Sequence, residues 1–156
     1  MNVLILNHHF NQDIHELEYF NSNMHTIKLI SPNYFANQAK RLFPKEVFGA
    51  DLKLFFKEQY NSNRRKYREI AFKLIYDIYK IYQFDLFIIP SDTFFYIRDV
   101  IDACEDINIP VVVIQKELGV SKYSLENHAS QIFETFPVKC SWMTTCSEES
   151  KKFWIK

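Results

Sequence analysis

Pairs of polar side chains that can act as acids, bases or anion ligands follow short apolar runs at four places in this sequence. The pairs are His8 and His9, Ser91 and Asp92, Lys116 and Glu117, and Ser147 and Glu148. An imidazole titrates at about pH 6.5, so it can act as a general base or contact a phosphate. A glutamate can act as a base or bind sugar hydroxyls, and a neighbouring lysine can bind a phosphate.

Each of these pairs also has a simpler interpretation. His8 and His9 can satisfy hydrogen bonds of their own loop, and the Lys116–Glu117 pair can be an ion pair at a sheet edge. Ser91 and Asp92 precede an expected helix, whose free N–H groups favour an anion. Asp92 can instead cap that helix, and its charge would then lie where a phosphate would bind.

The sequence predicts neither a metal site nor a cofactor. The three histidines within residues 8–15 lack a standard zinc-ligand spacing. Three cysteines are present, so at least one is unpaired in a monomer. We interpret Cys140 and Cys146, which are six residues apart, as small core residues on one face of a strand.

Glycine is scarce, and this scarcity excludes several classes of enzyme. The chain has two glycines, Gly49 and Gly119, where average usage of about 7% would give roughly eleven. Dinucleotide-binding fingerprints and Walker loops each need two or more glycines close together. The G-x-S-x-G nucleophile elbow is absent as well. The sequence therefore excludes Rossmann dehydrogenases, P-loop enzymes and hydrolases with that elbow.

The elements that must position the polar pairs alternate between strands and helices. Apolar or β-branched runs predict strands at residues 3–6, 26–30, 85–90, 111–114 and 139–146. Helical periodicity and capping residues predict helices at residues 11–20, 34–43, 50–60, 64–82, 93–108 and 123–136, and another from Glu148. Residues 61–63 are expected to form a turn or helix cap.

This alternation predicts an α/β fold with three layers. The sheet is expected to be open and mainly parallel, with five or more strands and helices on both faces, as in Rossmann-like domains. Ligands of such sheets bind beyond the carboxyl ends of the strands, near a switch in strand order. We therefore expect residues 1–156 to form a single domain whose polar pairs gather along one edge.

The composition fits one globular domain and sets limits on its partners. The chain has 156 residues, of which 47% are hydrophobic, and nineteen basic residues balance nineteen acidic ones. A formal net charge of zero gives no basis for nucleic-acid binding. The local basic cluster of Arg64, Arg65, Lys66 and Arg68 can dock on an anionic membrane surface, or it can be a solvated helix face.

The expected location is the cytoplasm. No run of about 18 apolar residues is present to span a membrane, and the apolar N-terminus lacks a basic leader. A peripheral membrane contact through the basic cluster is compatible with that location.

Residues 85–154 resemble the second half of the N-terminal domain of GT-B-type glycosyltransferases. The resemblance rests on the Pro- and Val-rich run at 109–114, the Lys116–Glu117 pair after it, and the Ser-Glu turn and helix at 147–154. The chain is most similar to bacterial surface-polysaccharide glycosyltransferases, glycerophosphotransferases and nucleotide-sugar 2-epimerases.

The resemblance implies an acceptor-binding domain that serves surface polysaccharide or glycoconjugate biosynthesis. A glycan or glycolipid acceptor would bind here, and a nucleotide-sugar donor would bind only through a further domain after Lys156. His9 and Glu117 are then the catalytic candidates, one of them the base for the acceptor hydroxyl. The substrate-binding candidates are His8, Ser91, Asp92, Lys116 and Ser147.

Two other functions fit the same scaffold. One is a non-catalytic module that binds a ligand or a partner subunit. The other is a complete small enzyme whose site lies between two copies of the chain.

Overall fold

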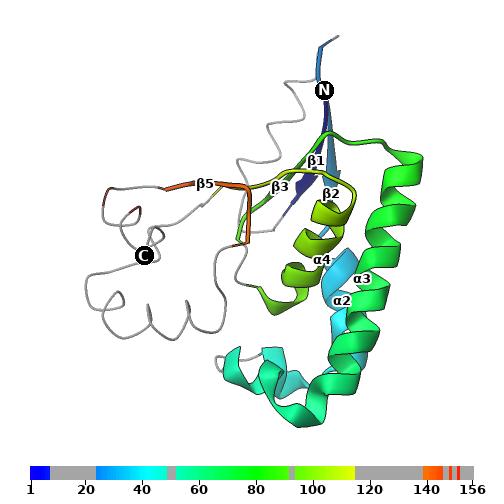
Figure 1. Cartoon of the computed structure of the whole chain (residues 1–156), viewed down its shortest axis with the longest axis vertical. Helices are drawn as coiled ribbons and strands as arrows, with labels where there is room; N and C mark the ends of the chain where they lie inside the picture. The colour runs from blue at the N-terminus through cyan, green and yellow to red at the C-terminus, as the bar shows by residue number, and fades with distance from the viewer. Residues whose placement is uncertain are drawn as a thin grey trace.

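The computed structural model describes residues 1–7, 24–48, 52–91, 94–114 and 139–145, together with Glu148 and Lys151. The strands are β1 (Asn2–Leu6), β2 (Thr26–Ile30), β3 (Leu86–Ile89), β4 (Val111–Ile114) and β5 (Trp142–Thr144). The α-helices of this part are α2 (Asn33–Leu42), α3 (Asn61–Ile81) and α4 (Phe95–Asp106) (Figure 1). Three short 3-10 helices, η2 (Lys45–Phe48), η3 (Leu52–Phe56) and η4 (Glu58–Tyr60), lie between α2 and α3 in the sequence.

The five strands form one sheet in the order β2-β1-β3-β4-β5, and every pair of neighbours is parallel. The expected α/β fold with a parallel sheet is therefore confirmed. The strands at 26–30 and 111–114 have the bounds that the sequence predicts. Because all strands run the same way, their carboxyl ends lie along one edge, which is where the polar pairs were expected.

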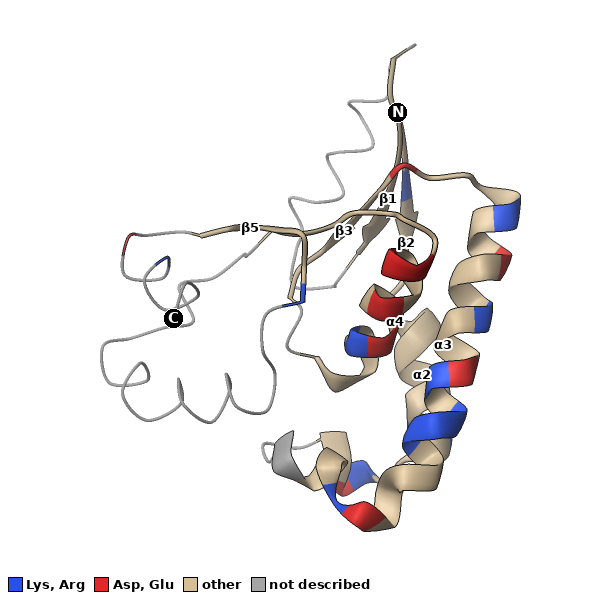
Figure 2. Ribbon diagram, viewed as in Figure 1, with Lys and Arg blue, Asp and Glu red and all other residues tan. Residues whose placement is uncertain are grey.

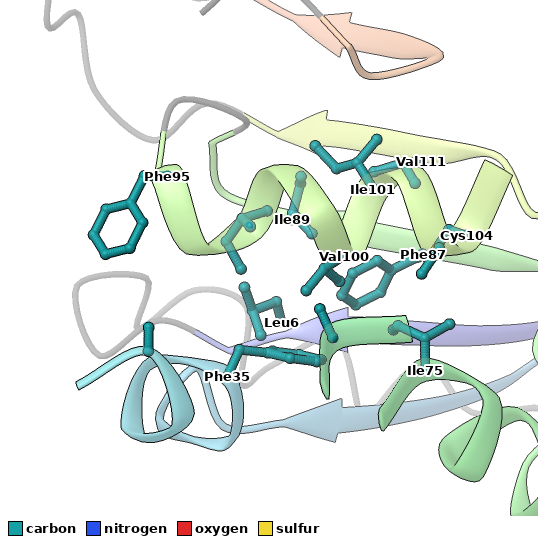
Figure 3. Close-up of a cluster of buried hydrophobic side chains, with 14 of the residues drawn as sticks. Leu6, Phe35, Ile75, Phe87, Ile89, Phe95, Val100, Ile101, Cys104 and Val111 are labelled. Atoms are coloured by element: carbon teal, nitrogen blue, oxygen red, sulfur yellow. The ribbon is translucent and has the colours of Figure 1, made fainter. Parts of the chain in front are cut away.

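The sheet is buried on both of its faces at β1. Leu4 and Leu6 belong to the large core cluster, which also holds residues of β3, β4, α2, α3 and α4. Val3 and Ile5 point the other way and form a second cluster with residues of β2 and β3. Figure 3 shows the large cluster, in which Leu6, Phe87 and Ile89 of the sheet meet side chains of the helices. The described helices therefore share one face of the sheet.

Helix α3 packs on the core through one narrow stripe. Its buried residues are Tyr67, Ala71 and Ile75, spaced four residues apart so that they share one face. The Tyr67 hydroxyl donates to the backbone oxygen of Tyr96 at 2.5 Å, which satisfies a buried polar group. The larger apolar side chains of Ile70 and Leu74 are only half-buried, whereas the small Ala71 lies in the stripe.

The connection before α3 differs from the prediction. The helix expected at 50–60 is replaced by η3 and η4, because Lys57 between them has an extended backbone (φ −60°, ψ 142°). The turn expected at 61–63 is instead the first turn of α3. A tertiary contact explains this, since the Asn63 side chain donates to the backbone oxygen of Leu42 at the end of α2.

The later elements are shorter than predicted. Helix α4 begins at Phe95 with Phe94 in the N-cap position. Asp92, to which the sequence allowed a capping role, lies outside the described residues. Strand β5 covers three of the eight expected residues. Cys140 precedes it and packs against the large core cluster from a half-buried position. Cys146 and the helices expected at 11–20 and 123–136 lie outside the described residues.

Asn108 ends α4 in a Schellman motif. It has a positive φ of 59°, in the left-handed region. The Ile109 N–H donates to the Cys104 oxygen at 2.8 Å, and the Asn108 N–H donates to the Glu105 oxygen at 2.9 Å. These are the two hydrogen bonds that define the motif, and they satisfy carbonyls that the end of the helix leaves open.

Replacing Asn108 with alanine is expected to lower the free energy of unfolding by about 1 kcal/mol, because a Cβ without a polar group disfavours the left-handed region. Asn108→Gly is the matched control, and it should change stability by less than about 0.5 kcal/mol. Urea unfolding followed by circular dichroism measures both variants. Equal stability of the alanine variant and the parent chain would contradict this account.

Candidate functional site

The first candidate site is the carboxyl edge of the sheet between β1 and β3. The chain leaves β1 toward β2 on one side and returns to β3 on the other, so the strand order switches here. Asn7 follows β1, and its N–H donates to the Ile30 oxygen at 2.8 Å. Ser91 lies just beyond β3, and both side chains are half-buried. This is the position where open α/β sheets bind ligands.

The structure places one of the predicted site residues directly. Ser91 lies beyond the carboxyl end of β3, at the switch point. The strands β1, β3, β4 and β5 all end at the edge where the remaining candidates were expected. Those remaining candidates lie outside the described residues, so their positions stay predictions: His8, His9, Asp92, Lys116, Glu117 and Ser147.

The second candidate site is a pocket of about 410 Å³ between the N-terminal halves of α3 and α4. We call it the α3–α4 pocket. Its lining consists of the phenylalanines Phe55, Phe56 and Phe95, the cationic residues Arg64, Arg65, Arg68, Arg98 and Lys139, and the carboxylates Asp99 and Asp102. Figure 2 shows basic residues of α3 beside acidic residues of α4, the neighbouring helix. The pocket therefore combines an apolar surface with charges of both signs.

An ion-pair network crosses this pocket. Arg68 Nη1 lies 2.9 Å from Asp99 Oδ1 and 2.5 Å from Asp102 Oδ2, so one guanidinium of α3 holds two carboxylates of α4. The Lys139 ammonium pairs with Asp102 from the segment that precedes β5. The network thus joins α3, α4 and residues about to enter the sheet. It opposes any sliding of these three parts past one another.

The two carboxylates of the network differ in their pKa. Burial raises the pKa of Asp99 above its ordinary value, and the opposing effect of Arg68 is smaller. Burial also acts on Asp102, but hydrogen bonds from Lys139 and Arg68 outweigh it and lower the pKa of Asp102. Asp102 is therefore held ionised, whereas Asp99 accepts a proton more readily than an ordinary aspartate.

Arg64 is fixed beside the pocket by the backbone. Its Nη1 donates to the Phe55 oxygen at 2.5 Å and to the Lys57 oxygen at 3.2 Å, and its Nη2 donates to the Asn61 side chain. Its guanidinium carbon lies 5.6 Å from the centroid of the Phe55 ring. These acceptors are uncharged, so they do not compensate the positive charge of Arg64.

The structure divides the basic cluster that the sequence singled out. Arg64, Arg65 and Arg68 line the α3–α4 pocket, and Lys66 does not. A contact between this cluster and a membrane surface remains a prediction. No helix within the described ranges has the length and apolarity needed to span a membrane. In the same ranges, no three His, Cys, Asp or Glu side chains converge in a way that could hold a metal ion.

The carboxylates of the pocket were not among the candidate residues predicted from the sequence. Asp99 and Asp102 are three residues apart, so they share one face of the helix that was expected at 93–108. Arg65 and Arg68 show the same spacing in the preceding helix. Two successive helices on one face of a parallel sheet pack side by side. These two spacings were therefore the sequence signal that could have indicated ion pairs between the helices. The pairing of particular residues still required the packed structure.

The fold defines a Rossmann-like α/β domain. No protein-family model and no curated protein matches the sequence. Among solved structures, the chain is similar to the UDP-GlcNAc 2-epimerase from Neisseria meningitidis, determined with UDP-GlcNAc bound, at a TM-score of 0.56 and 20% sequence identity. The similarity covers 99% of this chain and 42% of the epimerase, so this chain spans less than half of that protein's length. At this identity the similarity shows the fold.

Asp102→Asn should destabilise the protein by about 1–3 kcal/mol near neutral pH, because it removes the carboxylate that pairs with Lys139 and one of the two that pair with Arg68. A lowered pKa means that the ionised form of Asp102 stabilises the fold above its ordinary pKa. That contribution disappears as the pH falls through the lowered value. The variant and the parent chain should therefore converge in acid.

Urea unfolding at about pH 7 and about pH 3 measures this convergence. Asp77→Asn is the matched control, because Asp77 forms an exposed ion pair with Lys73 within α3. Its effect at neutral pH should be smaller than that of Asp102→Asn. An Asp102→Asn penalty that stays the same at both pH values would contradict the assigned role.

Proposed function

We propose that this chain is the acceptor-binding half of a two-domain GT-B-type enzyme of surface polysaccharide or glycoconjugate biosynthesis. The observation that carries the proposal is the fold similarity, which takes in almost all of this chain and less than half of an epimerase bound to UDP-GlcNAc. One Rossmann-like domain of such an enzyme has the size of this chain. A second domain would supply the other side of an interdomain cleft.

The parallel sheet supports the acceptor role because polar residues lie at its carboxyl edge. Asn7 and Ser91 flank the switch point between β1 and β3. In the proposed enzyme, His9 or Glu117 removes the proton of the acceptor hydroxyl as it attacks the donor sugar. The remaining candidates bind the sugar or phosphate groups of the acceptor, namely His8, Ser91, Asp92, Lys116 and Ser147.

The division of labour predicts how the isolated chain responds to a donor. Calorimetric titration of the 156-residue chain with UDP-GlcNAc should show no saturable binding tighter than about 1 mM, because in the proposed enzyme the donor binds to the other domain. The Neisseria meningitidis epimerase is the positive control, since its structure holds UDP-GlcNAc. A micromolar dissociation constant for the chain would place donor binding here and overturn the acceptor role.

The coding sequence beyond Lys156 tests the two-domain proposal, and one variant tests the catalytic assignment. The reading frame is expected to continue into a second α/β domain, and a stop codon at that point would overturn the two-domain proposal. In the joined protein, Glu117→Gln should lower kcat by about 10²–10⁴-fold, because the amide cannot accept the hydroxyl proton. Glu105→Gln removes an exposed carboxylate of α4 and should leave kcat unchanged. Full activity of the Glu117 variant would discard its role as the base.

A further inference from the structure

We propose that the α3–α4 pocket binds a small sugar phosphate, with the phosphate held by arginines and the sugar lying on the exposed Phe56 ring. This inference goes beyond the proposed function. It concerns residues between two helices and needs no second domain. It can therefore be tested with this chain by itself.

The charge of the lining is the first argument. Five cationic side chains and two carboxylates surround the pocket, which gives it a formal charge of +3. The whole chain is neutral, so this excess is local. Asp99 and Asp102 are both engaged by Arg68, and Asp102 also by Lys139. The charges of Arg64 and Arg65 are therefore left for an anion.

The position of Arg64 is the second argument. A guanidinium has five N–H donors, and three of them are used on the oxygens of Phe55, Lys57 and Asn61. These contacts hold the side chain in place and leave two donors for a ligand. A preorganised arginine binds a phosphate at a lower entropic cost than a mobile one.

The two helices add to the positive potential. The lining residues of α3 and α4 come mainly from their N-terminal halves. Neither helix has an acidic residue in its first turn or a side-chain hydrogen bond at its N-cap. Their dipoles therefore favour an anion at this end of the helix pair.

The apolar part of the lining indicates that the ligand carries more than a phosphate. The Phe55 and Phe95 rings are buried, and their centroids lie 4.6 Å apart. Phe56 next to them is 43% exposed. A volume of about 410 Å³ exceeds what inorganic phosphate fills and lies within the range of small-molecule sites. The exposed Phe56 ring suits the C–H face of a sugar, and the aspartate oxygens can accept hydrogen bonds from its hydroxyl groups.

Calorimetric titration at low ionic strength tests the inference, since salt screens charge interactions. The probes are glucose 1-phosphate, inorganic phosphate and glucose. The phosphate ester should bind saturably, inorganic phosphate more weakly, and glucose not measurably. No saturable binding of glucose 1-phosphate, or equal binding of glucose, would overturn the proposal.

Two neighbouring residues provide matched variants. Arg65→Gln and Lys66→Gln each remove one exposed positive charge from the same turn of α3, but only Arg65 lines the pocket. Arg65→Gln should weaken binding of glucose 1-phosphate at least about fivefold, whereas Lys66→Gln should change it less than about twofold. Equal losses in both variants would show a general charge effect and overturn the site.

A third variant reverses the sign of the effect. Asp99→Asn removes a negative charge from the lining while its amide oxygen can still accept a hydrogen bond from Arg68. It should therefore tighten binding of glucose 1-phosphate, by about twofold or more. Weaker binding in this variant would contradict an anion site, because a purely structural role of Asp99 predicts a loss.

Vesicles distinguish a lipid phosphate from a soluble one. The chain is mixed with phosphatidylcholine vesicles with and without phosphatidylglycerol, in the presence and absence of glucose 1-phosphate. Binding of glucose 1-phosphate to the chain, together with no binding of the chain to either kind of vesicle, would support a soluble sugar phosphate as the ligand. Vesicle binding that Arg65→Gln abolishes and Lys66→Gln preserves would support the phosphoryl site but assign it to a lipid headgroup, overturning the soluble ligand. The UDP-GlcNAc titration is independent of these results, so failure of the acceptor role would remain distinguishable.

Discussion

The rest of the structure depends on the burial of a parallel sheet on both of its faces. Residues Val3 to Leu6 of β1 are all buried, with alternate side chains entering two different core clusters. A parallel strand can be reached only by a connection that crosses a face of the sheet and returns to its amino edge. Every strand therefore ends at the same edge of the sheet. The residues that follow the strands lie along this edge because of the topology, and no contact between them is needed to bring them there.

The same constraint orients the helices that form the α3–α4 pocket. Each helix precedes or follows a strand of one direction, so α3 and α4 lie side by side and begin at the same end of the domain (Figure 1). Their first turns, their arginines and η3 therefore meet at one place. Arg68 and Lys139 compensate the two aspartates that α4 brings there. The pocket is thus a consequence of the sheet topology together with a few charged side chains.

Local sequence was sufficient for the elements whose residues are uniform in character. The β-branched run at 111–114 is a strand in any context that buries it, and its bounds were predicted correctly. The turn or helix cap expected at 61–63 is instead part of α3, where the Asn63 side chain bonds to Leu42, a residue 21 positions earlier. The partners of Arg68 lie 31 and 34 positions away, so a basic cluster on a helix gave no sign of them. Of the candidate site, the sequence predicted the edge and Ser91, and missed the pocket.

The net charge of the whole chain says little about which small ligands it can bind. A total of zero argues against attraction of a polyanion over the whole surface. Charges act over a Debye length of about 8 Å at physiological salt, however, so a small ligand responds only to the groups around its own site. Within the α3–α4 pocket the balance is +3, because the acidic residues that neutralise the chain lie mostly elsewhere. Neutrality of the whole molecule is therefore a stronger argument against binding of nucleic acid than against binding of a phosphate monoester.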